Sequence, residues 1–372
     1  MSPNRVHTPR PVRLQEAGLL LVIAVIGLLL SIFGGSVNLP RFESDTNGER
    51  QRVFFVNAEG ESVAAVDSKN KFFNAQNLAQ LAKDTSFIAI MAVGMTIVII
   101  AGQIDLSVGS TYALASVLGG LVLHAFGPDG DRAAQGALGA WLGSAVCVGT
   151  GLACGALNGS LITALRVHPF IITLGTMAVF RGIAFVTTEG QSVGGFPPGL
   201  RSIIRWETQN GLSLIPLVVM LFVAAAGAVL LSRMTTGRRI YAVGGNELAS
   251  KYSGIRVGQI KLGVFLASGL AAGIAALVSL GYYGAATSGD GQGYELKVIA
   301  ASVVGGASLA GGKGSALGAI LGALIIQMIE SGIVILGIDQ NYSQIIIGTV
   351  VVVAVVFDQL NTWWIRRRLL NP

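Results

Sequence analysis

Ten stretches of mostly apolar residues take up most of this chain of 372 residues, and they limit what it can fold into. A helix needs about 20 apolar residues to cross the hydrocarbon core of a bilayer. Backbone N–H and C=O groups in that core find partners only within the helix itself. The composition agrees, because 52% of the residues are hydrophobic and only 12% are charged. The sequence therefore predicts an all-α, polytopic integral membrane protein.

Positive charge orients these stretches. Basic residues precede the first stretch, crowd the loop 233–261, and follow the last stretch as Arg366–Arg368. Lys and Arg near the ends of membrane helices mark the cytoplasmic side. Ten crossings place both termini (1–15 and 361–372) and the 233–261 loop there. The expected spans are 16–36, 84–101, 106–126, 138–165, 169–188, 213–232, 262–283, 296–311, 315–336 and 343–360. The span 296–311 is short and glycine-rich, so a re-entrant segment is an open alternative.

A polar segment, 37–83, separates the first two spans and is expected on the outer face. Its middle carries two short β-prone runs, Val53–Val56 and Ser62–Val66, on either side of a Glu-Gly turn. Such a pattern predicts a β-hairpin. A disordered insert is the alternative, since an isolated hairpin is only marginally stable.

Glycine is abundant, with 51 residues, and much of it lies within the spans. Gly151, Gly155 and Gly159 are spaced by four, as are Gly318 and Gly322. Helices in lipid gain little from burying apolar surface against one another, so small residues that allow close backbone approach hold them together. We therefore interpret most of these glycines as packing contacts.

Motifs of soluble enzymes are absent from the sequence. The histidines His7, His124 and His168 are scattered and lack the spacing of metal ligands. The run Gly306–Gly314 resembles a phosphate loop but places Ala307 and Gly314 where that motif needs Gly and Ser or Thr. We expect no catalytic residues, no metal and no cofactor. Every basic cluster adjoins a membrane stretch, so we expect no nucleic-acid binding either.

Three features could carry a function. The first is Ala101–Ser110, which interrupts two spans and contains Asp105, a carboxyl that needs a partner or a polar cavity among apolar neighbours. A structural turn capped by Ser107 or Ser110 is the alternative to a role in a transport pathway. The others are Arg181 and Glu330 within spans, which are expected to face the protein interior, and the loop 233–261.

Within the 233–261 loop, Asn246 can cap a short helix that ends at Gly254. Helical spacing would place Leu248, Tyr252 and Ile255 on roughly one side. A short helix of this kind, held between two spans, suits docking of a cytoplasmic partner. A helix that lies on lipid headgroups is the alternative.

Four segments, in order, resemble the permease subunit of ribose/xylose-type ABC sugar importers, a family of inner-membrane components of binding-protein-dependent transport systems. The resemblance covers about residues 72–360. One position departs from the family, because Gln103 stands where a small residue or glycine is usual. The segments are Met91–Thr96 running into Ile104–Ser110, Pro169–Thr176, Tyr241–Asn246 with Ser253–Ile255, and Gly293–Leu296 through Gly305–Gly314.

The resemblance implies a single transmembrane permease domain, 1–372, in a bacterial plasma membrane. It also implies a second permease subunit that completes a dimer, cytoplasmic ATPase subunits and an external sugar-binding protein. The matching coupling helix comprises Asn246, Glu247, Leu248, Ala249, Tyr252, Ser253, Gly254 and Ile255. ATP hydrolysis belongs to the partner, so this chain is not itself an enzyme. Candidates for the sugar pathway are Asp105, Ser107, Ser110, Asn158 and Thr173.

Three other functions stay open at this stage. An ion-coupled secondary transporter also uses interrupted helices and would need Asp105, Arg181 or Glu330 for coupling. A branched-chain amino-acid permease is a near neighbour among ABC importers. A membrane scaffold would bind a soluble partner through the 233–261 loop without moving a solute. Few ionisable residues lie within the spans, which favours the ATP-driven importer.

Overall fold

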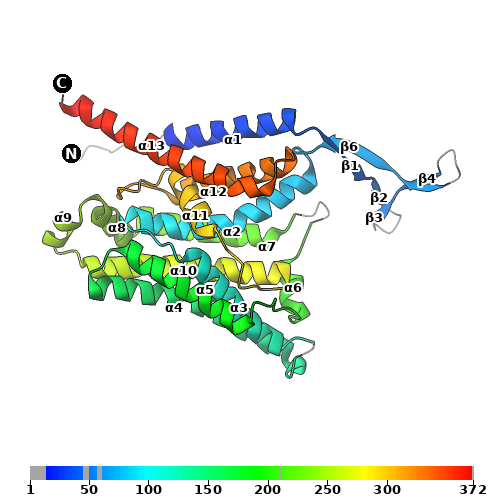
Figure 1. The fold of residues 1–372 in the computed structure, drawn as a ribbon, viewed down its shortest axis with the longest axis horizontal. Helices are drawn as coiled ribbons and strands as arrows, with labels where there is room; N and C mark the ends of the chain where they lie inside the picture. Colours follow the sequence, from blue (N-terminus) through cyan, green and yellow to red (C-terminus); the bar gives the residue numbers. More distant parts are fainter. Residues whose placement is uncertain (1–13, 45–49, 57–60, 129, 209–211, 371–372) are drawn as a thin grey trace, which may run out of the picture.

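The chain forms a bundle of long helices with a β-ribbon projecting from one end, as a computed structural model shows (Figure 1). The structure describes residues 14–370 except 45–49, 57–60, 129 and 209–211. Within that part, eight helices are long and apolar enough to cross a membrane. They are α1 (Leu14–Phe33), α2 (Ala75–Ile100), α3 (Val108–Ala125), α4 (Gly136–Leu165), α5 (Pro169–Thr188), α7 (Leu214–Arg233), α10 (Val257–Tyr283) and α12 (Ala316–Ile335).

These eight helices confirm eight of the expected spans, with one large shift in a boundary. Helix α2 begins nine residues before the expected start at 84, because Asn74 caps it by accepting a hydrogen bond from the backbone N–H of Asn77 (2.8 Å). The polar insert is correspondingly shorter than predicted. The remaining helices are α6 (Pro198–Ile204), α8 (Thr235–Gly245), α9 (Glu247–Tyr252), α11 (Tyr294–Val304) and α13 (Ser343–Leu370), with 3-10 turns at Ala133–Gln135 and Gln340–Tyr342.

The expected span 296–311 is wrong as a continuous helix. Helix α11 has 11 residues, so it extends only about 16 Å. A glycine-rich loop, 305–315, continues from it, and the backbone N–H of Gly312 donates to the carbonyl of Ile100 at the end of α2 (2.8 Å). The short helix therefore begins inside the bundle, where Tyr294 lies against Tyr112 of α3, and the loop after it reaches the end of α2.

Helix α13 replaces the expected last span and the tail after it. It starts at Ser343, as predicted, but continues as helix to Leu370. Its C-terminal end lies at the same end of the bundle as the start of α1 and as α8 and α9 (Figure 1). We call this the coupling end and the opposite end, from which the ribbon projects, the ribbon end. The N-terminal tail up to residue 13 lies outside the described residues.

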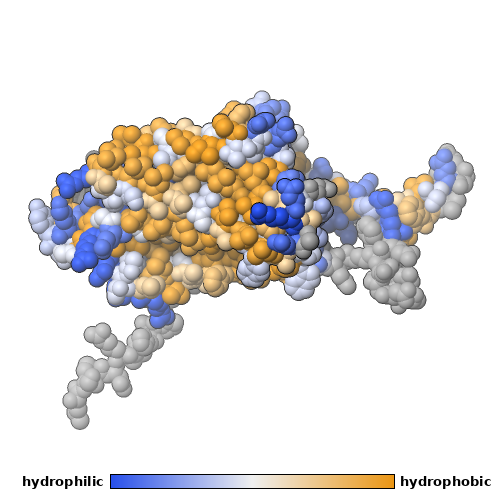
Figure 2. All heavy atoms as spheres, turned by 90° about the horizontal axis from the view of Figure 1, so that it is seen from below, coloured by the Kyte–Doolittle hydropathy of each residue, from blue (hydrophilic) through white to orange (hydrophobic). Residues whose placement is uncertain are grey.

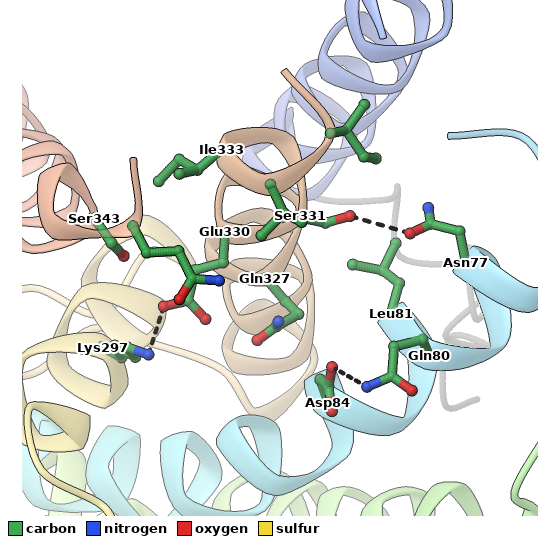
Figure 3. A pocket seen from close by; sticks show the side chains of 13 residues that line it. Asn77, Gln80, Leu81, Asp84, Lys297, Gln327, Glu330, Ser331, Ile333 and Ser343 are labelled. Carbon is green, nitrogen blue, oxygen red and sulfur yellow. Dashed lines mark hydrogen bonds and ion pairs between the residues drawn. The ribbon is translucent and has the colours of Figure 1, made fainter. Parts of the chain in front are cut away.

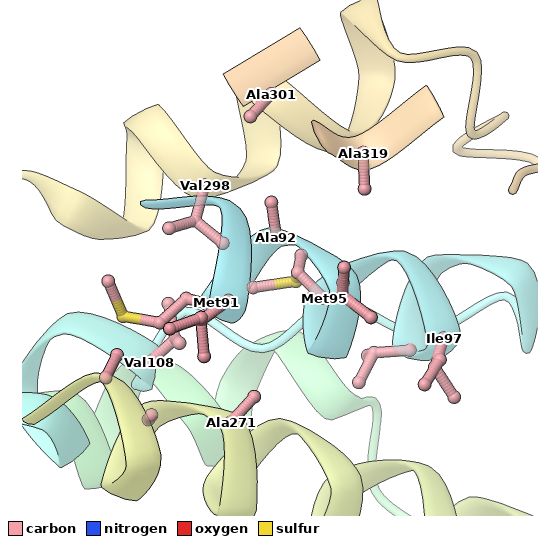
Figure 4. Close-up of a cluster of buried hydrophobic side chains, with 14 of the residues drawn as sticks. Met91, Ala92, Met95, Ile97, Val108, Ala271, Val298, Ala301 and Ala319 are labelled. Atoms are coloured by element: carbon pink, nitrogen blue, oxygen red, sulfur yellow. The ribbon is translucent and has the colours of Figure 1, made fainter. Parts of the chain in front are cut away.

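Helix α2 forms the centre of the bundle. In the most apolar 18 residues of α2, 94% of the residues are buried, whereas only 17% are buried in the corresponding parts of α1 and α5. Met91, Ala92 and Met95 project from α2 toward α10, α11 and α12 (Figure 4). The face seen in Figure 2 is apolar across its middle and hydrophilic at both ends. This distribution fits a bundle embedded in a bilayer with both ends in water.

Glycines bring the helix pairs into backbone contact, as predicted. A Cβ at Gly155 of α4 would collide with the carbonyl of Phe265 in α10, and Gly151 lies equally close to Gly269. In the same way, Gly318 and Gly322 of α12 lie against the C-terminal part of α11. Any larger residue at these positions would force the helices apart.

The insert is a branched β-ribbon rather than a disordered segment in its described part. The predicted hairpin is confirmed as β4 paired antiparallel with β5, and two further strand pairs accompany it. The three pairs meet where the backbones of Arg41, Val53 and Ala65 hydrogen-bond to one another in a ring (2.8–3.0 Å). The pairs are β1 (Ser36–Pro40) with β6 (Val66–Asn70), β2 (Phe42–Ser44) with β3 (Arg50–Arg52), and β4 (Phe54–Val56) with β5 (Ser62–Ala64).

Candidate functional site

The loop at the coupling end contains the short helix predicted from the sequence. Asn246 caps α9, and its Oδ1 accepts a hydrogen bond from the backbone N–H of Ala249 (2.9 Å). The chain leaves the helix through Gly254, whose φ of +82° lies in the left-handed region that favours glycine. Both residues that define the helix in the sequence therefore define it in the structure.

The outer side of α9 carries two large exposed side chains. Leu248 is 67% exposed and Tyr252 is 88% exposed, and α9 is one of the outermost elements of the coupling end (Figure 1). Ile255 does not join them, because it follows the left-handed turn and packs against the main hydrophobic core. The prediction that all three share one side was wrong for Ile255. Glu247, Ala249 and Ser253 are exposed as well.

Several contacts attach this loop to the bundle. Glu247 at the start of α9 forms an ion pair with Lys261 of α10 (2.9 Å). In α8, the hydroxyl of Tyr241 donates to the carbonyl of Gly314 (2.8 Å). A Cβ at Gly244 would collide with the carbonyl of Ile100, so the backbones of α8 and α2 touch there. Movement of α9 can therefore reach α2, α10 and the segment before α12.

Asp105 lies in the connection between α2 and α3 at this same end. One carboxylate oxygen accepts hydrogen bonds from the backbone N–H (3.0 Å) and the hydroxyl (2.6 Å) of Ser107. The other accepts one from the hydroxyl of Ser268 in α10 (2.8 Å). Burial raises the pKa of this carboxyl, and the hydrogen bonds oppose the rise. Asp105 thus joins the start of α3 to α10.

The structure brings the other pathway candidates around Asp105. The amide of Asn158 in α4 donates to the hydroxyl of Ser107 (2.8 Å), and the hydroxyl of Ser110 donates to the Ser107 carbonyl (2.8 Å). Thr173 lies at the edge, bonded within its own helix to Pro169 (3.0 Å) and 3.5 Å from the carbonyl of Ile104. All of these side chains are at least nine-tenths buried. The five residues therefore form a packed junction of α3, α4, α5 and α10.

A polar cavity of about 440 Å³ opens at the ribbon end (Figure 3). Lys297 of α11 forms an ion pair with Glu330 of α12 on one side. On the other side, Gln80 donates to Asp84 in α2 (2.9 Å). Amide, carboxylate and ammonium groups of this kind can hydrogen-bond a polyhydroxylated solute.

Sequence reasoning missed this cavity, although it singled out Glu330. Asp84 was placed at the edge of a span and Lys297 within the short stretch 296–311, with no signal that they face each other. Arg181, the other ionisable residue singled out within the spans, donates to the backbone carbonyls of Ser288 (2.7 Å) and Asp290 (2.5 Å). Among the described residues, no group of His, Cys, Asp and Glu side chains is arranged to hold a metal ion.

A bundle of membrane-spanning helices, with a glycine-broken crossing and an exposed helix anchored between two spans, defines a multi-pass membrane protein of the permease class. Residues 77–355 match the family described as the permease component of the branched-chain amino acid transport system, and the chain belongs to that family. The matched range leaves the ribbon outside.

Curated relatives cover most of the same chain. It is 37% identical to the ribose import permease of Escherichia coli strain K12 over 289 residues. These aligned residues make up 77% of this chain and 87% of the relative. It is 35% identical over 313 residues to the D-allose transport system permease of the same strain, covering 84% and 92%. The ribose import permease of Bacillus subtilis is 35% identical over 291 residues, covering 77% and 86%. No solved structure matches the chain significantly.

Proposed function

We propose that this chain is the permease subunit of an ABC importer in a bacterial plasma membrane and forms the pathway for a monosaccharide. An external binding protein delivers the sugar, and cytoplasmic ATPase subunits supply the energy. The relatives named for ribose and allose import support the substrate class. The single observation that supports coupling is α9, a capped helix that exposes Leu248 and Tyr252 at the coupling end.

The choice of a sugar over a branched-chain amino acid rests on the relatives and on the ribbon-end cavity. The family description names branched-chain amino acids, whereas the relatives quoted above are named for sugars. In the cavity, Lys297 and Glu330 neutralise each other, and Gln80 and Asn77 contribute amides. These groups can hydrogen-bond the hydroxyls of a sugar, beside the aliphatic residues Leu81, Ile333, Val334 and Ile335 that also line the cavity. We propose that this cavity lies on the entry route for the sugar.

The proposed coupling follows the contacts of the loop. Closure of the ATPase subunits pushes α9, and the Glu247–Lys261 ion pair passes the movement to α10. Helix α8 passes it to the end of α2 and to the segment before α12, through Gly244 and Tyr241. Because α2 is packed on all sides, it moves with its neighbours as a rigid body.

We further propose that two copies of this chain, embedded in lipid, complete the pathway, and that residues 1–372 act as one domain. The Asp105 junction has two possible roles. The hydrogen bonds that Asp105 accepts from Ser107 and Ser268, and the one that Asn158 donates to Ser107, favour a structural role that holds α3, α4 and α10 together. The amide oxygen of Asn158 has no hydrogen-bond partner within the described structure. A pathway role for Asp105, Ser107, Ser110, Asn158 and Thr173 remains a prediction, and the Asp105 variants described in the Discussion test it.

Capture of the ATPase by the purified chain tests the proposal. Tyr252→Ser should weaken the complex at least about tenfold, because truncating a tyrosine that is a hot spot of an interface costs about 2 kcal/mol or more. Tyr342→Ser is the matched control, since Tyr342 is 55% exposed but lies in the turn before α13, near the ribbon-end cavity. The measurement is the dissociation constant for the ATPase that co-purifies with this chain from its native membrane.

Two results would contradict the proposal. If Tyr252→Ser and Tyr342→Ser weaken the complex equally, α9 is not the docking element. If the folded chain captures no ATPase and takes up solute in vesicles under an ion gradient alone, it is a secondary transporter. In that case Asp105 or Glu330 becomes the candidate for ion coupling.

A further inference from the structure

The segment 284–293, which joins α10 to α11, runs back into the bundle without forming a helix. We call it the inner loop. It starts at the ribbon end, where the backbones of Ala286 and Val193 exchange two hydrogen bonds (2.9 and 2.8 Å) shortly after α5 ends. It ends against the first turn of α3, because a Cβ at Gly109 would collide with the carbonyl of Gly291.

The depth of the inner loop follows from the two helices that it contacts. Gly109 lies sixteen residues before Ala125, the ribbon-end residue of α3, and therefore about 24 Å below that end. Arg181, which donates to two carbonyls of the loop, lies about 10 Å below Thr188 at the ribbon end of α5. The hydrocarbon core of a bilayer is about 30 Å thick. The inner loop is therefore at the depth of the membrane interior, and α11 starts well inside the bundle (Figure 1).

One side of the inner loop is open to the outside of the chain. Gly289 and Gln292 are exposed, and Glu295 in the first turn of α11 is half-buried. Irregular backbone at this depth is tolerated only inside protein or along a water-filled cavity, because lipid offers it no hydrogen bonds. Ionisable side chains within a membrane follow the same rule. Lipid therefore cannot cover this side of the chain.

Hydrogen bonds fix the shape of the inner loop and leave two polar side chains free. Arg181 bonds the carbonyls of the loop, and the carboxylate of Asp290 accepts from the backbone N–H (2.9 Å) and the hydroxyl (2.7 Å) of Thr287. The side chains of Gln292 and Glu295, in contrast, make no hydrogen bond or ion pair with any described residue. These two side chains are left to contact water or a solute.

A second copy of this chain is the partner that fits beside the inner loop. Helix α5, which carries Arg181, is largely exposed. A Cβ at Gly175 or at Gly182 would have no other atom within 4 Å, and the spacing of seven residues places both on one face. Small residues of this kind let another helix approach closely in a membrane. Two-fold pairing through α5 would place the inner loops of both copies along one shared path.

We propose that Gln292 and Glu295 hydrogen-bond the sugar in a water-filled path that a second copy of this chain closes, and that Arg181 positions them through the inner loop. An amide and a carboxylate suit neighbouring hydroxyl groups, because together they offer both donors and acceptors. This inference rests on the proposed function and names the residues that contact the solute within the membrane. One copy alone leaves the site incomplete.

Thiol labelling tests the water-filled path without any transport. A charged, water-soluble maleimide reacts with a cysteine thiolate only where water reaches it. Gln292→Cys should be labelled in membranes, whereas the natural Cys147 and Cys154 are buried and should not react. Phe222→Cys is the matched control, because Phe222 lies near the middle of α7 and is 73% exposed on an apolar face. It should stay unlabelled.

A bifunctional thiol reagent then tests the second copy. It should join two Gln292→Cys chains across the path and should not join Phe222→Cys chains. If Gln292→Cys is labelled no faster than Phe222→Cys, the inner loop does not face water and the proposal is wrong. Labelling without cross-linking would overturn the role of the second copy.

Uptake by the complete importer in vesicles tests the contact with the sugar. Ribose and allose serve as probes, and ATP hydrolysis is measured in parallel. Gln292→Leu should reduce uptake about tenfold through the loss of a hydrogen bond, while ATP hydrolysis continues. Gln191→Leu is the matched control, because Gln191 is exposed just beyond the ribbon end of α5, and it should change neither rate. Arg181→Lys keeps the charge but not the planar fork, so it should change the ratio of ribose to allose uptake.

The outcomes separate this inference from the proposed function. Equal losses of uptake and ATP hydrolysis in Gln292→Leu would show a structural role and overturn the sugar contact. An unchanged ratio of the two sugars in Arg181→Lys would overturn the positioning role. If the assembled importer moves neither sugar, the proposed substrate class is wrong, whereas labelling and cross-linking at position 292 still establish the path.

Discussion

The two ends of the bundle are both polar, yet they are built in opposite ways. At the coupling end, α8 and α9 contact the membrane-spanning helices through an ion pair, a side-chain hydrogen bond and a close contact between the backbones of α8 and α2. At the ribbon end, the insert extends away from the bundle and is held mainly at its base (Figure 1). There Asn70 donates to the carbonyl of Ser31 in α1 (2.7 Å) and accepts from Phe72 and Phe73.

This difference shows which polar segment can transmit force. A loop moves the spans only if it is attached to several of them, and α8–α9 is attached to α2, α10 and the segment before α12. The ribbon has two-stranded pairs with exposed Phe54 and Phe55, and isolated pairs are marginally stable. The coupling end is thus built to transmit movement, and the ribbon is built to be reached from outside.

Among the variants that test this difference, Gly244→Val should lose the most stability. Its Cβ would collide with the carbonyl of Ile100 and the backbone N–H of Gly312, and backbone atoms cannot rotate away. Overpacking of this kind costs about 3 kcal/mol of stability, so the unfolding midpoint in detergent should drop clearly. Gly245→Val is the matched control, because no other atom lies within 4 Å of a Cβ at that position.

Gly245→Val should therefore melt close to the unmodified chain. If Gly244→Val and Gly245→Val lose the same stability, the effect comes from helix propensity in α8 and not from its contact with α2. That result would contradict the proposed attachment of the coupling end. The attachment is also contradicted if Gly244→Val melts normally and still supports uptake, since α8 would then not be attached to α2.

Asp105 variants should have the next largest effect and separate structure from transport. Asp105→Ala leaves the donors of Ser107 and Ser268 unpaired in a buried site and should reduce stability by about 2–3 kcal/mol. Asp105→Asn can keep these hydrogen bonds if the Ser268 hydroxyl turns to accept from the new amide. It should therefore melt near the unmodified chain.

Sugar uptake into vesicles then decides the role of the charge. Normal uptake by Asp105→Asn fits the structural junction. A stable Asp105→Asn variant with uptake abolished would show that the negative charge itself acts in the pathway. That result would shift the functional centre from the ribbon-end cavity to the Asp105 junction.

The sequence predicted the features whose signals are local. Apolar length placed eight spans, Asn246 and Gly254 placed α9, and a Glu-Gly turn placed the β4–β5 hairpin. The resemblance to sugar-importer permeases, carried by segments within 72–360, is confirmed by the relatives named for ribose and allose and by the family match over 77–355. Each of these signals lies within a window of a few residues to one helix.

What the sequence could not predict depends on long-range packing. The break after α11 was seen only as a glycine-rich stretch, because the hydrogen bond that carries its loop to Ile100 joins distant residues. Hydropathy likewise does not distinguish α2, at a mean of 1.7, from α5, at 1.8, although one is enclosed and the other is largely exposed. The pairing of Lys297 with Glu330 and the turning inward of Ile255 have the same origin.

Shortening the ribbon should have the smallest effect on the fold and gives the sharpest test of the contrast. The backbone N–H of Arg41 already donates to the carbonyl of Ala65 (2.8 Å), so an Asn-Gly turn can replace Phe42–Ala64 and close the β1–β6 pair as a hairpin. The variant should insert normally, and its free energy of unfolding should lie within about 0.5 kcal/mol of that of the unmodified chain.

ATPase capture by the shortened chain should be unchanged, because α9 lies at the other end. Uptake that falls only at limiting concentrations of the binding protein would assign the ribbon to docking on the outer face. Aggregation of the shortened chain would instead show that the ribbon is packed on the spans, and the two ends would no longer differ.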